Sequence, residues 1–259
     1  LVRVIDTYLM RYDFENIKTV LRAKYTKSEG EAEDLLIAAG CLRRPFFLKL
    51  LKEESIEAAL EKNCLVDFKK IKQAYDKFKN SNVLGEIENA FDAEYYSYLF
   101  GLATKIPKQG KQFRDFLESE LEVVNIMNVF RLKRAGVSKA DALSYLLPVS
   151  RVMKQKLTKL LDAEISEAQT IFLMTPYAKL VEEGLESLQR TGSLIEMETK
   201  LKSYLLKKTT MLIREHPLSV DVILGYMFAK DMEVRNLKLM LKGKQLGLDD
   251  AFIESQLVV

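Results

Sequence analysis

Apolar residues recur along most of the chain at the three- and four-residue spacing of an amphipathic helix. Residues 13–25 illustrate the pattern, because Phe14, Ile17, Leu21 and Tyr25 fall on one stripe of a helix. No segment shows the alternation of apolar and polar residues that a half-buried strand requires. The sequence therefore predicts an all-α protein with many helices of two to six turns.

Capping residues and glycines divide this helical pattern into segments. Ser28 followed by Glu31 forms a capping-box pattern, in which each side chain can bond a free N–H of the first helical turn. The helix that starts there is predicted to cover 28–39 and to end at Gly40, in the left-handed conformation common after helices. Further helices are predicted over 64–79, 83–104, 111–134 and 193–214.

One helical pattern occurs three times, at intervals of roughly 110 residues. Its shared form is an acid, two residues, Asn, Ile or Leu, two residues, two apolar residues, Arg or Lys, one residue and Lys. The three segments are Asp13–Lys24, Glu122–Lys133 and Glu233–Lys244. The positions of greatest interest in them are the asparagines Asn16, Asn125 and Asn236 and the basic residues Arg22, Arg131 and Lys242.

This interval indicates a repeated domain, because solenoid repeats are only 20–50 residues long. Each copy is expected to consist of a few long helices followed by the Asn helix and a short capped helix. The predicted domains are 1–44, 45–163 and 164–259. Only 15 residues precede Asn16, so the first domain is expected to be N-terminally incomplete.

Asparagine is unfavourable inside a helix, so its repetition at matching positions indicates a specific role. One interpretation is a hydrogen bond from the side-chain amide to backbone at a contact between helices or repeats. The other is direct contact with a partner protein. The basic residues Arg22, Arg131 and Lys242 also have two interpretations. They are either solvated helix ends that interact favourably with the helix dipole or residues in direct contact with a partner protein.

The composition agrees with long helices and excludes several classes of protein. The 259 residues include 11 Gly and 5 Pro, too few for a chain with many turns. Forty basic residues against 37 acidic ones give +3, without the concentrated positive charge of a nucleic-acid-binding protein. The longest apolar run, 35–42, is too short to span a bilayer. Cys41 and Cys64 are expected to be reduced thiols in the core or at its boundary, in a cytosolic protein.

The sequence contains no motif for nucleotide binding, hydrolysis or metal-dependent catalysis, since GxxxxGK[ST], GxGxxG, HExxH and GxSxG are all absent. The single histidine, His216, precedes Pro217 at a predicted helix start, where a surface or capping role is expected. Asp249 and Asp250 lie at a predicted N-cap. Four methionines at apolar helical positions are expected to fill the core: Met211, Met227, Met232 and Met240. No catalytic residue, metal or cofactor is expected.

The repeated segments resemble the C subunit of archaeal and bacterial A/V-type ATPases, the counterpart of the d subunit in the eukaryotic V-ATPase. The likeness is clearest over 228–244, continues through 245–259, and includes the first motif at Tyr12–Ile17. It covers the whole chain in layout, although only the three motif segments match closely. The family's N-terminal helices have no counterpart at the start of this sequence.

The resemblance implies a funnel of three helical domains about a pseudo-threefold axis. It also implies a non-catalytic component on the cytoplasmic end of the membrane proteolipid ring. This component would form a socket for the D and F subunits of the central stalk and transmit torque. Membrane association would be peripheral, through the ring, and no nucleic acid or small-molecule substrate would bind. The residues alone leave open a generic helical scaffold for other soluble partners.

Overall fold

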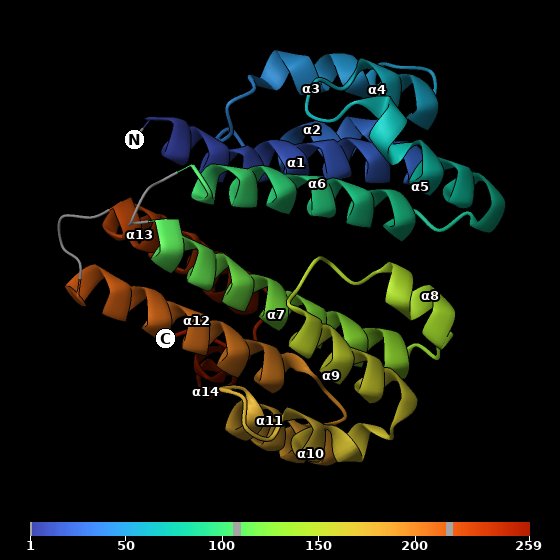
Figure 1. The fold of residues 1–259 in the computed structure, drawn as a ribbon. Coiled ribbons are helices and arrows are strands. Elements are labelled where there is room, and N and C mark those ends of the chain that lie inside the picture. Colours follow the sequence, from blue (N-terminus) through green and yellow to red (C-terminus); the bar gives the residue numbers. More distant parts are fainter. Residues whose placement is uncertain (1, 106–109, 216–219) are drawn as a thin grey trace. The chain divides into compact units, whose positions relative to one another are not determined.

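The computed structural model describes residues 2–105, 110–215 and 220–259, and these form helices joined by short connections without any strand (Figure 1). The all-α prediction is confirmed. His216 and Pro217 lie outside the described residues. The chain forms two compact units, Leu1–Ile106 and Pro107–Val259, which we call unit 1 and unit 2.

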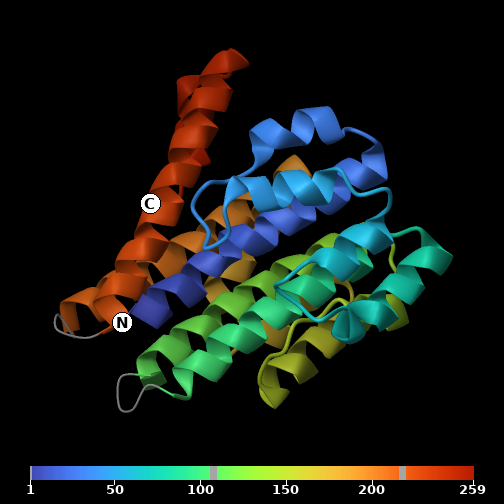
Figure 2. The same ribbon diagram turned by 90° about the horizontal axis from the view of Figure 1, so that it is seen from above.

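Unit 1 is built around its first and last helices, which lie side by side (Figures 1 and 2). Its helices are α1 (Val2–Thr26), α2 (Glu29–Leu35), α3 (Arg44–Leu51), α4 (Ile56–Lys62), α5 (Phe68–Ser81) and α6 (Gly85–Ala103). Helices α2, α3 and α4 pack on α1, and α5 packs on α6. Three members of the predicted apolar stripe of α1, Phe14, Ile17 and Leu21, are no more than 2% exposed in this core, whereas Tyr25 near the end of the helix is 42% exposed.

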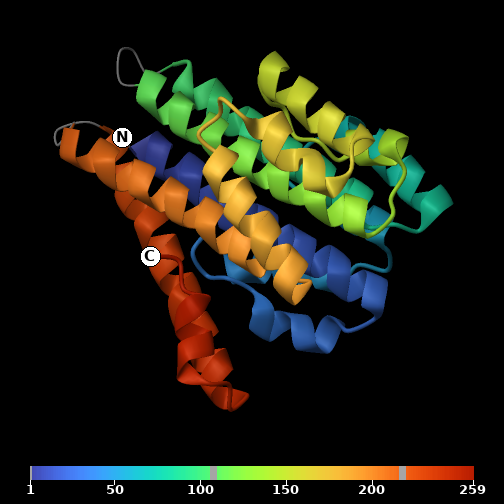
Figure 3. The same ribbon diagram turned by 90° about the horizontal axis from the view of Figure 1, so that it is seen from below.

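Unit 2 is built around α12, which packs against α7, α11 and α13 (Figure 3). Its helices are α7 (Gly110–Arg134), α8 (Lys139–Ser144), α9 (Arg151–Asp162), the 3₁₀ turn η1 (Ile165–Glu167), α10 (Ala168–Phe172), α11 (Ala178–Thr191), α12 (Ile195–Glu215), α13 (Val220–Gln245) and α14 (Asp250–Ser255). The described part of α7 buries Phe116, Leu121, Ile126 and Phe130 almost completely.

The order of helices in unit 1 occurs again in unit 2. Helices α5 and α11 each have 14 residues and start 110 positions apart, and α1 packs on α6 as α7 packs on α12. Helices α13 and α14 then begin the same order a third time. Counted from its Asn helix, this order runs over α1–α6 and α7–α12, whereas the predicted domains 1–44, 45–163 and 164–259 are counted with that helix near the end. Their division into three domains remains a prediction.

The segment after α1 differs from its predicted form. Helix α2 ends at Leu35, not near residue 39, because the chain turns extended at Leu36 and bonds to α1. Ser28 does not cap α2, since its hydroxyl lies 2.7 Å from the Thr26 hydroxyl. Gly40 is not among the residues with positive φ and is not a left-handed cap.

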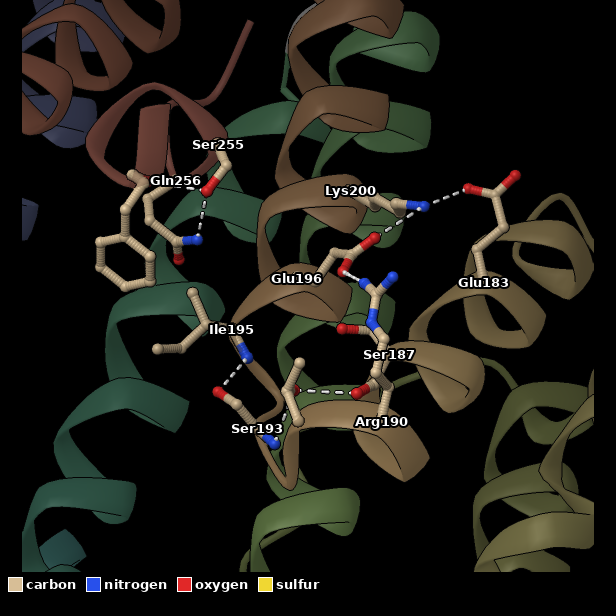
Figure 4. Close-up of polar contacts among 11 residues, drawn as sticks. Glu183, Ser187, Arg190, Ser193, Ile195, Glu196, Lys200, Ser255 and Gln256 are labelled. Carbon is tan, nitrogen blue, oxygen red and sulfur yellow. Dashed lines mark hydrogen bonds and ion pairs between the residues drawn. The ribbon is translucent and has the colours of Figure 1, made fainter. Parts of the chain in front are cut away.

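A corner of charged residues joins α11 to α12 in unit 2 (Figure 4). Lys200 Nζ lies 2.6 Å from Glu183 and 3.2 Å from Glu196, and an Arg190 nitrogen lies 3.4 Å from Glu196. The hydrogen bond from Lys200 lowers the pKa of Glu183. These contacts hold α11 and α12 together on the solvent-exposed side of the turn that joins them.

Three side chains lie elsewhere than predicted. Cys41 and Cys64 are exposed free thiols, because both belong to loops between helices. Met211 is 60% exposed on α12, whereas Met232 is buried as expected. Among the helices that the structure describes, none has a stretch long and apolar enough to cross a membrane.

The three Asn helices end in the same left-handed turn. The residue with positive φ is Lys27 after α1, Gly136 after α7 and Gly247 after α13, with φ of 57°, 69° and 68°. In each turn the residue after the one with positive φ donates its N–H to the carbonyl of the residue five positions before it, which is the pattern of a Schellman cap. The bonds are Ser28 to Ala23, Val137 to Leu132 and Leu248 to Gly243.

Replacing Lys27 with glycine is expected to raise the free energy of unfolding by about 0.5–1 kcal/mol, because glycine adopts this conformation without the steric cost that a Cβ atom brings. The matched control is Gly136→Lys, which is expected to lower it by a similar amount. Urea denaturation followed by circular dichroism measures both. A destabilising Lys27→Gly would contradict the assignment of Lys27 to a glycine position.

Candidate functional site

Each of the three predicted asparagines pairs with the backbone of one residue beyond the following short helix. The side-chain Nδ2 donates to the carbonyl of that residue, and its N–H donates to the asparagine Oδ1. The pairs are Asn16 with Ile37 (2.9 and 2.8 Å), Asn125 with Leu147 (3.1 and 2.8 Å) and Asn236 with Val258 (2.8 and 3.0 Å). We call this arrangement the asparagine clamp.

The clamp satisfies backbone groups that the short helix leaves unpaired. The residue that each asparagine binds lies outside a helix, so its N–H and carbonyl need partners other than the hydrogen bonds of a helix. In unit 2, Asn125 is fully buried and Leu147 is 3% exposed, so water cannot supply those bonds. The backbone hydrogen bond, one of the two roles that the sequence suggests, is therefore present in every repeat.

The basic residue six positions after the asparagine forms an ion pair in two repeats. Arg22 donates to both carboxylate oxygens of Glu88, at 2.6 and 2.9 Å, which joins α1 to α6. Arg131 donates to Glu198 at 2.5 Å and joins α7 to α12 in the same way. Both arginines are about half exposed, so each pair contributes about 1 kcal/mol or less. Lys242 bonds only within α13, to Gln245.

A lysine two positions further on caps another helix in both complete repeats. Its ammonium group donates to two carbonyl oxygens at the C-terminal end of α3 or α9, where the helix dipole favours a positive charge. The bonds are Lys24 to Leu51 and Glu53 (2.9 and 2.5 Å), and Lys133 to Leu161 and Ala163 (3.0 and 2.6 Å).

The acid three positions before the asparagine differs between repeats. Asp13 is fully buried and accepts the backbone N–H groups of Cys41 and Leu42, at 2.8 and 3.0 Å. Glu122 instead accepts the hydroxyl of Tyr177 at 2.8 Å. Glu233 pairs with Lys230 on the surface. The clamp is therefore common to all three repeats, whereas the acid has a different kind of partner in each.

Burial raises the pKa of Glu122, and this outweighs the opposing effect of its hydrogen bond from Tyr177. A carboxyl group whose pKa is raised in the folded state contributes stability below its unfolded pKa. That contribution is lost as the pH rises through the folded value. Glu118 and Lys208 are the other charged groups that act on Glu122.

Glu122→Gln is expected to become more stable relative to the unmodified protein as the pH rises from about 4 to about 7, because the variant lacks this titration. Glutamine still offers an oxygen to Tyr177. The measurement is the free energy of unfolding at both pH values, with Glu186→Gln at an exposed position of α11 as the control. An equal difference at the two pH values would contradict the raised pKa.

The two glutamates of the ion pairs were not among the predicted residues. A signal was nevertheless present, because Glu86-Ile87-Glu88 and Glu196-Met197-Glu198 stand 110 positions apart, as the asparagines nearly do. Glu198 also accepts Lys202 and Arg235, and so joins α13 to α12.

The six predicted residues do not form one catalytic site. They belong to three repeats, and each asparagine and arginine has partners within its own unit. Within the described ranges, no group of three or more His, Cys, Asp or Glu side chains is placed to hold a metal ion. The arrangement supports a structural role for these residues, as fixed joints between helices.

Comparison with known proteins identifies similar sequences. Residues 2–256 match the family model described as ATP synthase (C/AC39) subunit. The C subunit of the A-type ATP synthase from Methanococcoides burtonii is 34% identical over 99% of this chain and 71% of its own length. The same-named protein of Methanosarcina barkeri is 35% identical over 99% and 70%, and that of Haloquadratum walsbyi 32% over 98% and 74%.

Proposed function

The chain belongs to the ATP synthase (C/AC39) subunit family, and we propose that it is the non-catalytic rotor adaptor of an A/V-type ATPase. It sits peripherally on the cytoplasmic end of the proteolipid ring. There it forms a socket for the base of the central stalk, which consists of the D and F subunits. The observation that carries the proposal is the family match over residues 2–256.

The repeated joints suit a part that transmits torque. Rotation applies force between two surfaces of the adaptor, so its helices must not slide past one another. Close-packed helical cores deform little. The asparagine clamp fixes the end of each short helix, and the Arg22–Glu88 and Arg131–Glu198 pairs tie the first helix of a repeat to its last.

In this proposal the chain does no chemistry of its own. Ions pass through the ring, and ATP is made or hydrolysed in the head of the enzyme. The adaptor binds neither nucleic acid nor a small-molecule substrate.

Removal and restoration of the adaptor test the proposal. An ATPase that lacks this protein is expected to retain ATP hydrolysis in its detached head. Its membranes are expected to lose ATP-driven ion transport. Adding the purified protein restores transport and brings the D and F subunits back to the membrane. Full transport without the adaptor, or failure of a well-folded sample to retain the D subunit, would contradict the proposed role.

A further inference from the structure

Helix α9 carries a row of basic side chains on the surface of unit 2. The helix packs on α7, α8 and α10 (Figure 1), and its buried residues Met153, Leu157 and Leu160 lie on one side. The opposite side lines a shallow hollow with residues at helical spacing. These residues are Arg151, Lys154, Gln155, Thr158 and Lys159.

The three cations of this row have no acidic partner. Arg151, Lys154 and Lys159 are exposed, and none of them forms an ion pair with a residue that the structure describes. Asp162 is the only acid of α9, and it pairs with Lys139 at 2.6 Å. The row therefore presents uncompensated positive charge to the outside of unit 2.

The equivalent helix of unit 1, α3, has an acid beside it. Positions in the two units correspond at an interval of 110, as the residues bound by the clamps do. Arg44 is the equivalent of Lys154, and it bonds Glu33 at 3.0 Å. The position equivalent to Glu33 is Leu143, so unit 2 offers no carboxylate there.

Apolar side chains protrude beside the basic row. Val152 is 64% exposed, Leu173 is 52% exposed, and Met174 is fully exposed. Lys156 donates to the carbonyl of Leu173 at 3.3 Å and to that of Ile171 at 2.7 Å. Because Val152 and Lys156 are four positions apart, they lie on the same side of α9. The loop after α10 therefore continues the surface of α9 next to Val152.

The equivalent loop of unit 1 is built differently. Asn63 stands where Leu173 stands, and its Oδ1 accepts the N–H groups of Leu65 and Val66 at 3.1 and 2.9 Å. Asn63, Leu65 and Val66 are all buried. Met174 instead has a φ of 63°, a strained conformation for a residue with a Cβ atom, and its side chain gains no burial. Exposed apolar residues and unpaired cations therefore occur together at α9.

This combination fits the surface of an anionic bilayer. Protruding apolar side chains enter the headgroup region, and lysine and arginine beside them interact with its negative potential. Each cation near the surface strengthens binding about fivefold. A partner helix would instead need an apolar groove, whereas the residues that line the hollow on α9 are polar and charged.

We propose that α9 and the loop after α10 bind anionic lipid headgroups at the membrane surface. Lipid phosphate groups lie along Arg151, Lys154 and Lys159, and Leu173 and Met174 enter the interface beside them. This contact adds to the attachment through the proteolipid ring and does not depend on the rotor function.

Vesicle flotation of the purified full-length protein tests the proposal without any other subunit. At about 50 mM salt, the protein is expected to bind vesicles with about 30% phosphatidylglycerol roughly 50-fold more tightly than vesicles of phosphatidylcholine alone. Combining Arg151→Gln, Lys154→Gln and Lys159→Gln is expected to weaken binding to the anionic vesicles about 100-fold.

The matched control removes the same charge elsewhere. Combining Lys52→Gln, Lys69→Gln and Lys72→Gln at exposed positions of unit 1 is expected to weaken binding by no more than about threefold. An equal loss in the two triple variants would overturn the proposal, because it would show that only net charge matters.

A fluorescent probe tests entry of the loop into the interface. In protein with serine at positions 41 and 64, an environment-sensitive dye on Met174→Cys is expected to shift its emission to shorter wavelength with anionic vesicles. The same dye on Glu186→Cys, at an exposed position of α11, is expected to remain unchanged. Bound protein without a shift at position 174 would contradict insertion of the loop.

Two further outcomes would assign the surface to another ligand. Release of the protein from the vesicles by inorganic phosphate, but not by sodium chloride of the same ionic strength, would overturn the proposal in favour of a phosphate site. Absence of vesicle binding, together with protection of Met174→Cys from a maleimide in the assembled ATPase, would overturn it in favour of a protein partner. Because the vesicles contain no ring, neither result bears on the rotor function.

Discussion

Replacing Asn125 with alanine is expected to lower the free energy of unfolding by about 2–4 kcal/mol, because a buried N–H and a buried carbonyl of Leu147 each lose their partner. Both residues are at most 3% exposed, so water cannot replace the two bonds without opening the core. Urea denaturation followed by far-UV circular dichroism measures the change.

Asn236→Ala is the matched control, since Asn236 makes the same two bonds in a half-buried setting. Its cost is expected to be smaller, about 1–2 kcal/mol, because Asn236 is half-buried, so water can enter the space that its side chain leaves, although Val258 itself is only 2% exposed. If Asn125→Ala costs less than Asn236→Ala, the clamp is not the reason for the repeated asparagine.

Gly40→Ala is expected to lower the free energy of unfolding by about 2–4 kcal/mol, through steric overlap and lost hydrogen bonds. A Cβ atom at Gly40 would lie 2.0 Å from Asp13 Oδ1, so the carboxylate must leave the N–H groups of Cys41 and Leu42. The control Gly30→Ala places its Cβ in open space within α2. It is expected to stabilise the protein by about 0.5–1 kcal/mol.

A double-mutant cycle separates the overlap from other effects of alanine. In an Asp13→Ala background the carboxylate is absent, so Gly40→Ala is expected to cost less than half of its original value. An unchanged cost would show that Gly40 is needed for a reason other than its contact with Asp13.

Helix content and most helix positions could be predicted because periodicity and caps are local properties. Helix α7 begins and ends within one residue of its prediction, and Asp249 caps α14 through its side chain, as predicted. The end of α2 could not be predicted from local signals. It is set by Asn16, which binds Ile37 from another helix.

The packing partners of the Asn helices also required the structure. The interval between the asparagines gives the length of the repeat, but it does not show which helices cover an Asn helix. In the structure α6 packs on α1, and α12 packs on both α7 and α13. The partners Glu88 and Glu198 were missed because each stands 66 or 67 residues from its arginine, beyond any local pattern.

Electron cryomicroscopy of the intact ATPase would locate this chain and so test the proposed rotor role. We expect one copy on the rotation axis, with one surface on the proteolipid ring and the other around the base of the central stalk. A chain located in a peripheral stalk or in the catalytic head would contradict it.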